Sequence, residues 1–83
     1  MQITLDKLPI GKTGTISKIN LDDSLKRRLL DLGFIKGVSI KALYKSPFND
    51  PTCYLIKGCF IALREENTHN IIINIGDDQD GTY

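Results

Sequence analysis

Few side chains in this 83-residue chain could carry out chemistry, and His69 is its single histidine. Glu65 and Cys59 are plausible neighbours of His69 that could share a metal ion with it. Transition metals accept imidazole, carboxylate and thiolate ligands, but the chain lacks the paired histidines or Cys-x-x-Cys spacing that usually mark a metal site. We therefore treat these three residues as a candidate metal site, with a histidine on a surface turn as the favoured interpretation.

Catalytic signatures are also missing. The Gly11-Lys12-Thr13 sequence invites comparison with a phosphate-binding loop, but that motif requires a glycine where this chain has Asp6, and it requires a helix to follow. A turn leading into a strand is the better interpretation. With one possible histidine base and no serine elbow, the chain shows no catalytic triad. We predict that the protein is not an enzyme.

Charge gives no argument for a nucleic acid or a membrane surface as the partner, because the formal net charge is +1. The one basic cluster, Lys26-Arg27-Arg28, lies among aspartates that could pair with it along a helix, which favours a solvated helix face. Leu30 is about 140° round such a helix from Leu25. It is either covered by a neighbouring loop or exposed as a contact for a partner, and both interpretations stay open.

A short helix over residues 22–32 must position these side chains. Asp22 supplies an acidic group where the first backbone N–H groups of a helix lack partners. Leu25, Leu29 and Leu32 then recur with the spacing of one apolar stripe, which predicts that this face packs on the core.

The sequence also predicts where this helix ends. Gly33 can adopt the left-handed conformation that ends a helix, and Phe34 can fold back on Leu29 in a Schellman-type contact. Gly37 marks a second turn before the next strand. We expect Leu29, Leu32, Gly33 and Gly37 to serve the fold.

The rest of the chain reads as short strands separated by polar turns. Alternating apolar residues or turn signals predict five strands, at residues 14–19, 38–45, 52–56, 59–63 and 71–75. Ile16 and Ile19 break the alternation of the first strand and predict a twist or a bulge. Residues 46–51, with two prolines, are predicted to be a loop, and residues 65–70 a polar connection.

The two cysteines are predicted to be free thiols. Lys57-Gly58 has the length and composition of a tight hairpin turn, which would pair Ile56 with Cys59 and Cys53 with Ala62. In that register the two sulfur atoms point to opposite sides of the sheet, so they cannot form a disulfide. Free thiols are typical of a reducing cytosol.

One helix among about five strands cannot build parallel βαβ units, so the predicted fold is mainly β, a small antiparallel barrel. Residues 1–75 form the one domain, and the acidic residues 76–83 are expected to be a frayed tail. The first residues lack the features of a signal peptide, and no apolar run is long enough for a membrane span. We expect a cytoplasmic protein.

Taken together, these residues resemble the FeoA family, whose members are small SH3-like barrels associated with bacterial ferrous iron transport. The resemblance rests on L-x-x-L-P-x-G-x-x-G-x-I at residues 5–16, RLLDLGFIKG at residues 28–37, the Asp50-Pro51 loop, and Y-x-I-x-G-x-x-I-A-L-R at residues 54–64. It implies a non-enzymatic accessory protein that docks on the cytosolic GTP-binding domain of FeoB, a membrane permease.

For the partner-binding surface we predict two parts. The first is the helix face with Arg27, Leu30 and Phe34, and Leu29 is a second candidate there although we expect it in the core. The second part is the loop that contains Pro47, Asp50 and Pro51. A protein without a catalytic constellation must act through its surface, which agrees with such a role.

Two alternatives remain. The chain is also similar to the SH3-like C-terminal domain of iron-dependent transcriptional repressors, although those domains accompany a helix-turn-helix domain that this chain is too short to contain. The other alternative is a protein that binds ferrous iron directly through His69, Glu65 and Cys59. Oligomeric state stays open.

Overall fold

The computed structural model describes residues 1–76, and the predicted tail therefore lies almost wholly outside the described residues. Within this range the elements are β1 (Gln2–Thr4), the 3-10 turn η1 (Leu5–Lys7), β2 (Thr13–Ile19), α1 (Asp23–Asp31), β3 (Ser39–Lys45), β4 (Thr52–Ile56), β5 (Cys59–Leu63), α2 (Glu65–Thr68) and β6 (Ile71–Asn74). The predicted helix and all five predicted strands are present. Short elements joined by tight turns are what the spacing of glycine, proline and apolar residues dictates.

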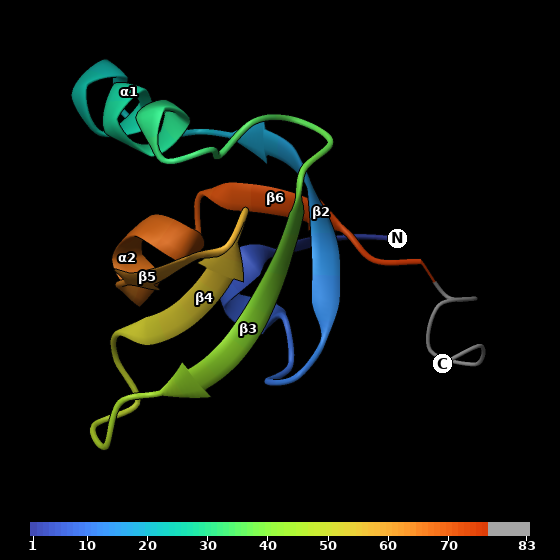
Figure 1. The fold of residues 1–83 in the computed structure, drawn as a ribbon, viewed down its shortest axis with the longest axis vertical. Coiled ribbons are helices and arrows are strands. Elements are labelled where there is room, and N and C mark those ends of the chain that lie inside the picture. Colours follow the sequence, from blue (N-terminus) through green and yellow to red (C-terminus); the bar gives the residue numbers. More distant parts are fainter. Residues whose placement is uncertain (77–83) are drawn as a thin grey trace.

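The strands form one antiparallel sheet in the order β1-β6-β2-β3-β4-β5. The sheet curls around the core, while α1 covers one end and the loop of residues 46–51 projects from the other (Figure 1). The sequence predicted a barrel of about five strands, and the described sheet has six. The additional strand is β1, whose Ile3 pairs with Ile73 of β6. The barrel is not closed by hydrogen bonds, since β1 and β5 are edges that do not pair with each other.

The core lies inside the curled sheet. Its fully buried side chains come from most strands and from the segment after α1, and include Leu5, Ile16, Phe34, Ile40, Ile56, Ile71 and Ile73. Ile71 and Ile73 are buried on β6 while Asn74 is exposed, as alternation in a strand requires. The strand periodicity read from the sequence therefore identifies the inward face of β6.

Two β-bulges bend the sheet. In β2 the pairing with β6 shifts between Ile16 and Lys18, which confirms the predicted irregularity. In β3 the pairing with β4 shifts between Ala42 and Tyr44. The second bulge was not predicted. It adds a residue to β3 before Tyr44, and the Tyr44 side chain is exposed although the buried Ile40 and Ala42 precede it at alternate positions.

The β4–β5 hairpin has the predicted register, with Ile56 opposite Cys59 and Cys53 opposite Ala62. Lys57 and Gly58, the two turn residues, both have positive φ, 49° and 78°, as a two-residue type I′ turn requires. Both cysteines are free, Cys53 buried and Cys59 exposed. The prediction of unpaired thiols is confirmed.

Residues 65–70, predicted to be an irregular connection, contain the short helix α2 instead. Its first N–H group has no capping side chain from the preceding residue, Arg64. Asp50, in the distant loop before β4, takes that role: the Glu65 N–H donates to Asp50 Oδ1 at 2.9 Å. This cap comes from another part of the chain, so local sequence could not reveal it.

Asp6 connects η1 to the end of α2. His69 Nδ1 lies 3.4 Å from Asp6 Oδ2, while Asp6 Oδ1 and the Thr4 hydroxyl are buried without a well-formed hydrogen bond. Burial disfavours the Asp6 carboxylate, but the Thr4 hydroxyl and the His69 ring outweigh burial and lower the pKa of Asp6 below its usual 3.8. The contact adds a polar link between η1 and the end of α2, beside the paired strands β1 and β6.

Replacing Asp6 by asparagine is expected to lower the free energy of unfolding at neutral pH and to reduce its dependence on pH. A carboxyl group whose folded pKa lies below its unfolded pKa stabilises the fold above the unfolded value. That contribution disappears as the pH falls through the folded pKa. Urea unfolding at neutral pH and below pH 3.8, the usual aspartate value, measures both effects.

Asp31→Asn is the matched control, because Asp31 is exposed and its side chain forms no hydrogen bond or ion pair in the described part of the chain. It should leave the acid dependence unchanged. Equal acid dependence in Asp6→Asn and wild type would contradict the role given to the Asp6–His69 contact.

Candidate docking surface

The start of α1 is fixed by its own sequence. Asp22 precedes the first helical residue with extended backbone, and its Oδ1 accepts a hydrogen bond from the Leu25 N–H at 2.9 Å. This is the predicted N-cap. Leu29 is buried and Leu25 is partly buried against the core, so the helix packs on the sheet through these two side chains.

The end of α1 is a Schellman motif, as the sequence predicted. The Gly33 N–H donates to the Leu30 carbonyl at 3.1 Å, and the Phe34 N–H donates to the Leu29 carbonyl at 2.9 Å. Gly33 has a φ of +103°, which a residue with a Cβ atom rarely adopts. The turn directs Phe34 straight into the core.

Three apolar side chains at this helix end remain on the surface. Leu30, Leu32 and Ile35 keep 44%, 45% and 47% of their area exposed, and we call them the helix-end patch. The expectation that Leu32 serves the core is wrong, because Leu32 is the C-cap residue and the chain turns away from the helical path just after it. For Leu30, the exposed alternative is the one observed.

The predicted helix-face contact residues divide into two groups. Arg27 is exposed and forms no ion pair with any other residue in the range 1–76. Leu29 and Phe34 keep only 2% and 0% of their area exposed, so neither can touch a partner while the fold is intact. The Schellman turn places both of these side chains inside the fold.

The loop of residues 46–51 is held by its own hydrogen bonds. The Ser46 hydroxyl donates to the Asp50 carbonyl at 2.7 Å, and the Ser46 N–H donates to the Pro51 carbonyl at 3.0 Å. Asp50 is also the cap of α2 and lies 3.9 Å from the Arg64 guanidinium. Pro47 is exposed, Pro51 is partly buried, and the Asp50–Pro51 peptide is cis. Asp50 thus has a structural role as well as its predicted place in the loop.

The helix end and this loop do not form one surface. β3 begins shortly after α1 and ends where the loop begins, and a strand of this length spans about 20 Å. Figure 1 shows α1 and the loop at opposite ends of the molecule. The structure therefore separates the two parts of the predicted contact surface.

The candidate metal ligands are not brought together. Cys59 begins β5 and Glu65 follows its end, so the length of a strand, about 15 Å, separates them. His69 faces Asp6 instead. Within residues 1–76 no group of three or more His, Cys, Asp or Glu side chains could hold a metal ion.

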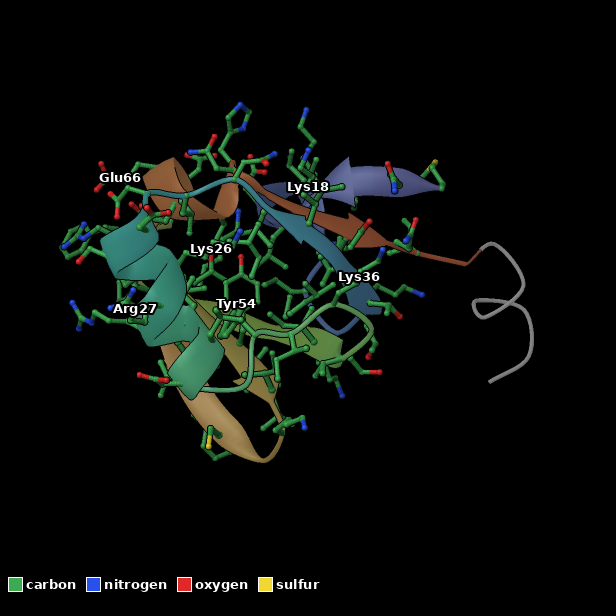
Figure 2. All side chains as sticks on the ribbon, turned by 90° about the horizontal axis from the view of Figure 1, so that it is seen from above. Lys18, Lys26, Arg27, Lys36, Tyr54 and Glu66 are labelled. Atoms are coloured by element: carbon green, nitrogen blue, oxygen red, sulfur yellow. The ribbon has the colours of Figure 1, made fainter. Side chains whose placement is uncertain are left out.

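A groove of about 340 Å³ runs between α1 and β2, beside the helix-end patch. Leu30 and the otherwise buried Phe34 line it, together with the three lysines Lys18, Lys26 and Lys36. Figure 2 shows these lysines coming from β2, from α1 and from the segment after α1. Sequence reasoning missed this cluster, because the three positions are far apart in the chain and only tertiary packing gathers them.

These features define a small SH3-like β domain with one helix, whose distinguishing features are on its surface. The family model of the FeoA domain matches residues 3–75, and the chain belongs to the FeoA family. It is 30% identical over 73 residues to an Fe(2+) transport protein A of Campylobacter jejuni, covering 88% of this chain and 99% of that protein. Resemblance to this family, predicted from the motifs, is confirmed.

A second relative is the Fe(2+) transport protein A/Fe(2+) transporter FeoB fusion protein of Porphyromonas gingivalis. It is 27% identical over 71 residues, which are 86% of this chain and 8% of the fusion protein. Among solved structures, FeoA of Chlorobium tepidum matches with a TM-score of 0.84 and 26% identity, over 88% of this chain and 70% of that one.

Two further structures bear on the fold class. FeoA of Stenotrophomonas maltophilia, described as an SH3 domain protein, matches with a TM-score of 0.76 and 25% identity over 87% of this chain and 89% of its own. The T. acidophilum protein IdeR matches with a TM-score of 0.77 and 24% identity, over 90% of this chain but 34% of its own. The predicted SH3-like fold is confirmed, and the likeness to IdeR is one of fold. No helix in residues 1–76 has the length and apolar character needed to cross a membrane.

Gly33→Ala is expected to lower the free energy of unfolding by about 1–2 kcal/mol, because a Cβ atom is strained at positive φ. The new Cβ atom would also lie 3.2 Å from Lys57 Cδ, but that exposed side chain can move aside. Gly37→Ala is the matched control, since Gly37 has a φ of +94° and open space around it. Urea unfolding should show similar losses. A much larger loss at Gly33 would show that the close approach of Lys57 matters.

The native protein is expected to react at one thiol with a reagent such as 5,5′-dithiobis(2-nitrobenzoate), and at both thiols in urea. Cys59 is exposed and Cys53 is buried, and only an accessible thiolate reacts. Cys59→Ser should abolish the reaction of the native protein. Two reactive thiols in the native state would contradict the burial of Cys53, and none would contradict free thiols.

Proposed function

We propose that this protein is a cytoplasmic, non-enzymatic accessory factor of bacterial ferrous iron uptake that docks on the cytosolic domain of a FeoB-type permease. The observation that carries the proposal is the fusion protein of Porphyromonas gingivalis, in which a related sequence and a FeoB transporter share one polypeptide. Covalent linkage holds two domains at a high effective concentration, which favours contact between them. We propose the same contact for the present chain.

The helix-end patch is the surface that best supports docking. Leu30, Leu32 and Ile35 are each nearly half exposed at the end of one helix. Exposed apolar side chains are frequent in binding surfaces. Arg27 lies exposed on the same helix and can extend the contact at its edge.

The loop with Pro47, Asp50 and Pro51 would be a second, independent contact. It lies at the opposite end of the molecule from α1 (Figure 1), so a partner must be large or clamp-like to touch both. Phe48 at its tip keeps 89% of its area exposed. Variants at the two ends can therefore be interpreted separately.

The alternative role, a regulatory module like the C-terminal domain of iron-dependent repressors, has weaker support. The likeness to IdeR, at 24% identity, concerns the fold. Direct binding of ferrous iron by His69, Glu65 and Cys59 is not proposed, because the structure keeps these side chains apart.

Leu30→Asp is expected to weaken binding of the purified protein to the cytosolic domain of a cognate FeoB permease by at least about tenfold, because it places a charge where an apolar side chain would be buried. Isothermal titration calorimetry measures the affinity. Thermal unfolding should be little changed, since Leu30 is already 44% exposed.

Ile10→Asp is the matched control, because Ile10 is 46% exposed and lies in the turn before β2, away from the helix end. It should bind like wild type. Pro47→Glu tests the loop in the same assay. Wild-type affinity in Leu30→Asp together with lost affinity in Pro47→Glu would move the docking surface to the loop, and no binding by wild type would refute the proposed function.

A further inference from the structure

The groove between α1 and β2 carries a concentration of positive charge that the whole chain does not have. Lys18, Lys26 and Lys36 line it, and no aspartate or glutamate among residues 1–76 does. Residues 1–76 carry a formal charge of +4, with eleven Lys and Arg against seven Asp and Glu, and the three groove lysines account for most of this excess. The groove therefore attracts anionic groups.

None of the three ammonium groups is neutralised within residues 1–76, where they form no ion pair or side-chain hydrogen bond. In Figure 2, Lys26 lies on the side of α1 that faces β2, whereas Arg27 lies on the far side of the helix. An anionic partner would thus meet free charges and displace no internal contact.

The floor of the groove is apolar, which argues against a simple inorganic anion as the occupant. Leu30, which keeps 44% of its area exposed, supplies the accessible apolar surface between the lysines, and the buried side chains of Ile16 and Phe34 lie beneath it. A bound phosphate ion would leave this apolar surface exposed to water, which is unfavourable. A peptide can instead bury one apolar side chain on the floor of the groove and place acidic side chains near the lysines.

One wall of the groove is also an unpaired strand edge. β2 pairs with β3 through Thr13, Gly14 and Thr15, while Lys18 and Ile19 pair only with β6. Beyond Ile16 no described strand lies on the β3 side of β2. Backbone groups on such an edge can bind an extended peptide by adding a strand.

We infer that this groove binds an extended acidic peptide segment with an apolar residue at its centre. The inference rests on the proposed function for the protein that would carry the segment, namely the cytosolic part of the permease. It adds the chemistry of the contact: lysines on the rim, an apolar floor and a strand edge. The helix-end patch adjoins the groove through Leu30, so both would belong to one contact surface.

A synthetic peptide tests the groove without the permease. We would titrate the isotope-labelled protein with acetylated and amidated Glu-Asp-Glu-Leu-Asp-Glu and follow backbone amide signals by NMR. Shifts are expected at Ser17, Lys18 and Lys36, and they should vanish in about 1 M NaCl, where the Debye length is about 3 Å. A peptide with lysine at every acidic position should cause none, and replacing its leucine by serine should weaken binding.

Two double variants test whether the positive charge of the groove lysines is needed for binding. Lys18→Glu/Lys36→Glu should bind both the acidic peptide and the permease domain about tenfold more weakly, which corresponds to about 1.4 kcal/mol. Lys7→Glu/Lys41→Glu is the matched control, because it makes the same change in net charge at exposed lysines that do not line the groove. Thermal unfolding of both variants checks that each is folded.

The outcomes separate this inference from the proposed function. If wild type binds the permease domain and Lys18→Glu/Lys36→Glu binds it equally well, the groove is not the contact and the inference is overturned, while the proposed function stands. If the permease domain does not bind at all, the proposed function fails and the peptide titration decides: shifts along the groove support recognition of acidic peptides, and their absence overturns it.

Discussion

The Schellman turn at the end of α1 sends Phe34 into the core in the same step in which it ends the helix. Gly33 provides the left-handed residue, and the Phe34 N–H closes the turn on the Leu29 carbonyl. Both Phe34 and Leu29 are buried, and burial of one such side chain contributes about 1.5–3 kcal/mol. The position of the helix over the sheet depends on this anchor, and so does the direction of the segment that follows.

The burial of Leu29 and Phe34 also determines which apolar side chains near the end of α1 remain exposed. Because the turn directs Leu29 and Phe34 inward, Leu30, Leu32 and Ile35 must remain partly in solvent. The same packing leaves space between α1 and the end of β2, which becomes the groove. The apolar patch and the basic groove are thus consequences of how the helix is attached, and both support a role in binding another protein.

An open sheet of this size needs help from polar contacts at its margins. The curl of the sheet comes from two bulges, after Ile16 in β2 and after Ala42 in β3, and β1 and β5 remain unpaired edges. Asp6 and His69 connect η1 to α2, and Asp50 caps α2 from the distant loop. These contacts tie η1, α2 and the loop of residues 46–51 to the same small core, so that the two proposed docking surfaces keep their shape.

The sequence by itself determined the caps of α1, the register of the β4–β5 hairpin and the inward face of β6, because interactions between nearby residues are enough to fix each of them. Each depends on residues within a few positions of one another, such as Asp22 with Leu25, or Lys57 with Gly58. Tertiary structure alone decided the rest. β1 has only three residues and forms because β6 offers a partner, and Tyr44 is exposed at a bulge in β3 that only the pairing with β4 reveals. The gathering of lysines in the groove, and the separation of the helix end from the loop, follow from distances in space that sequence spacing does not encode.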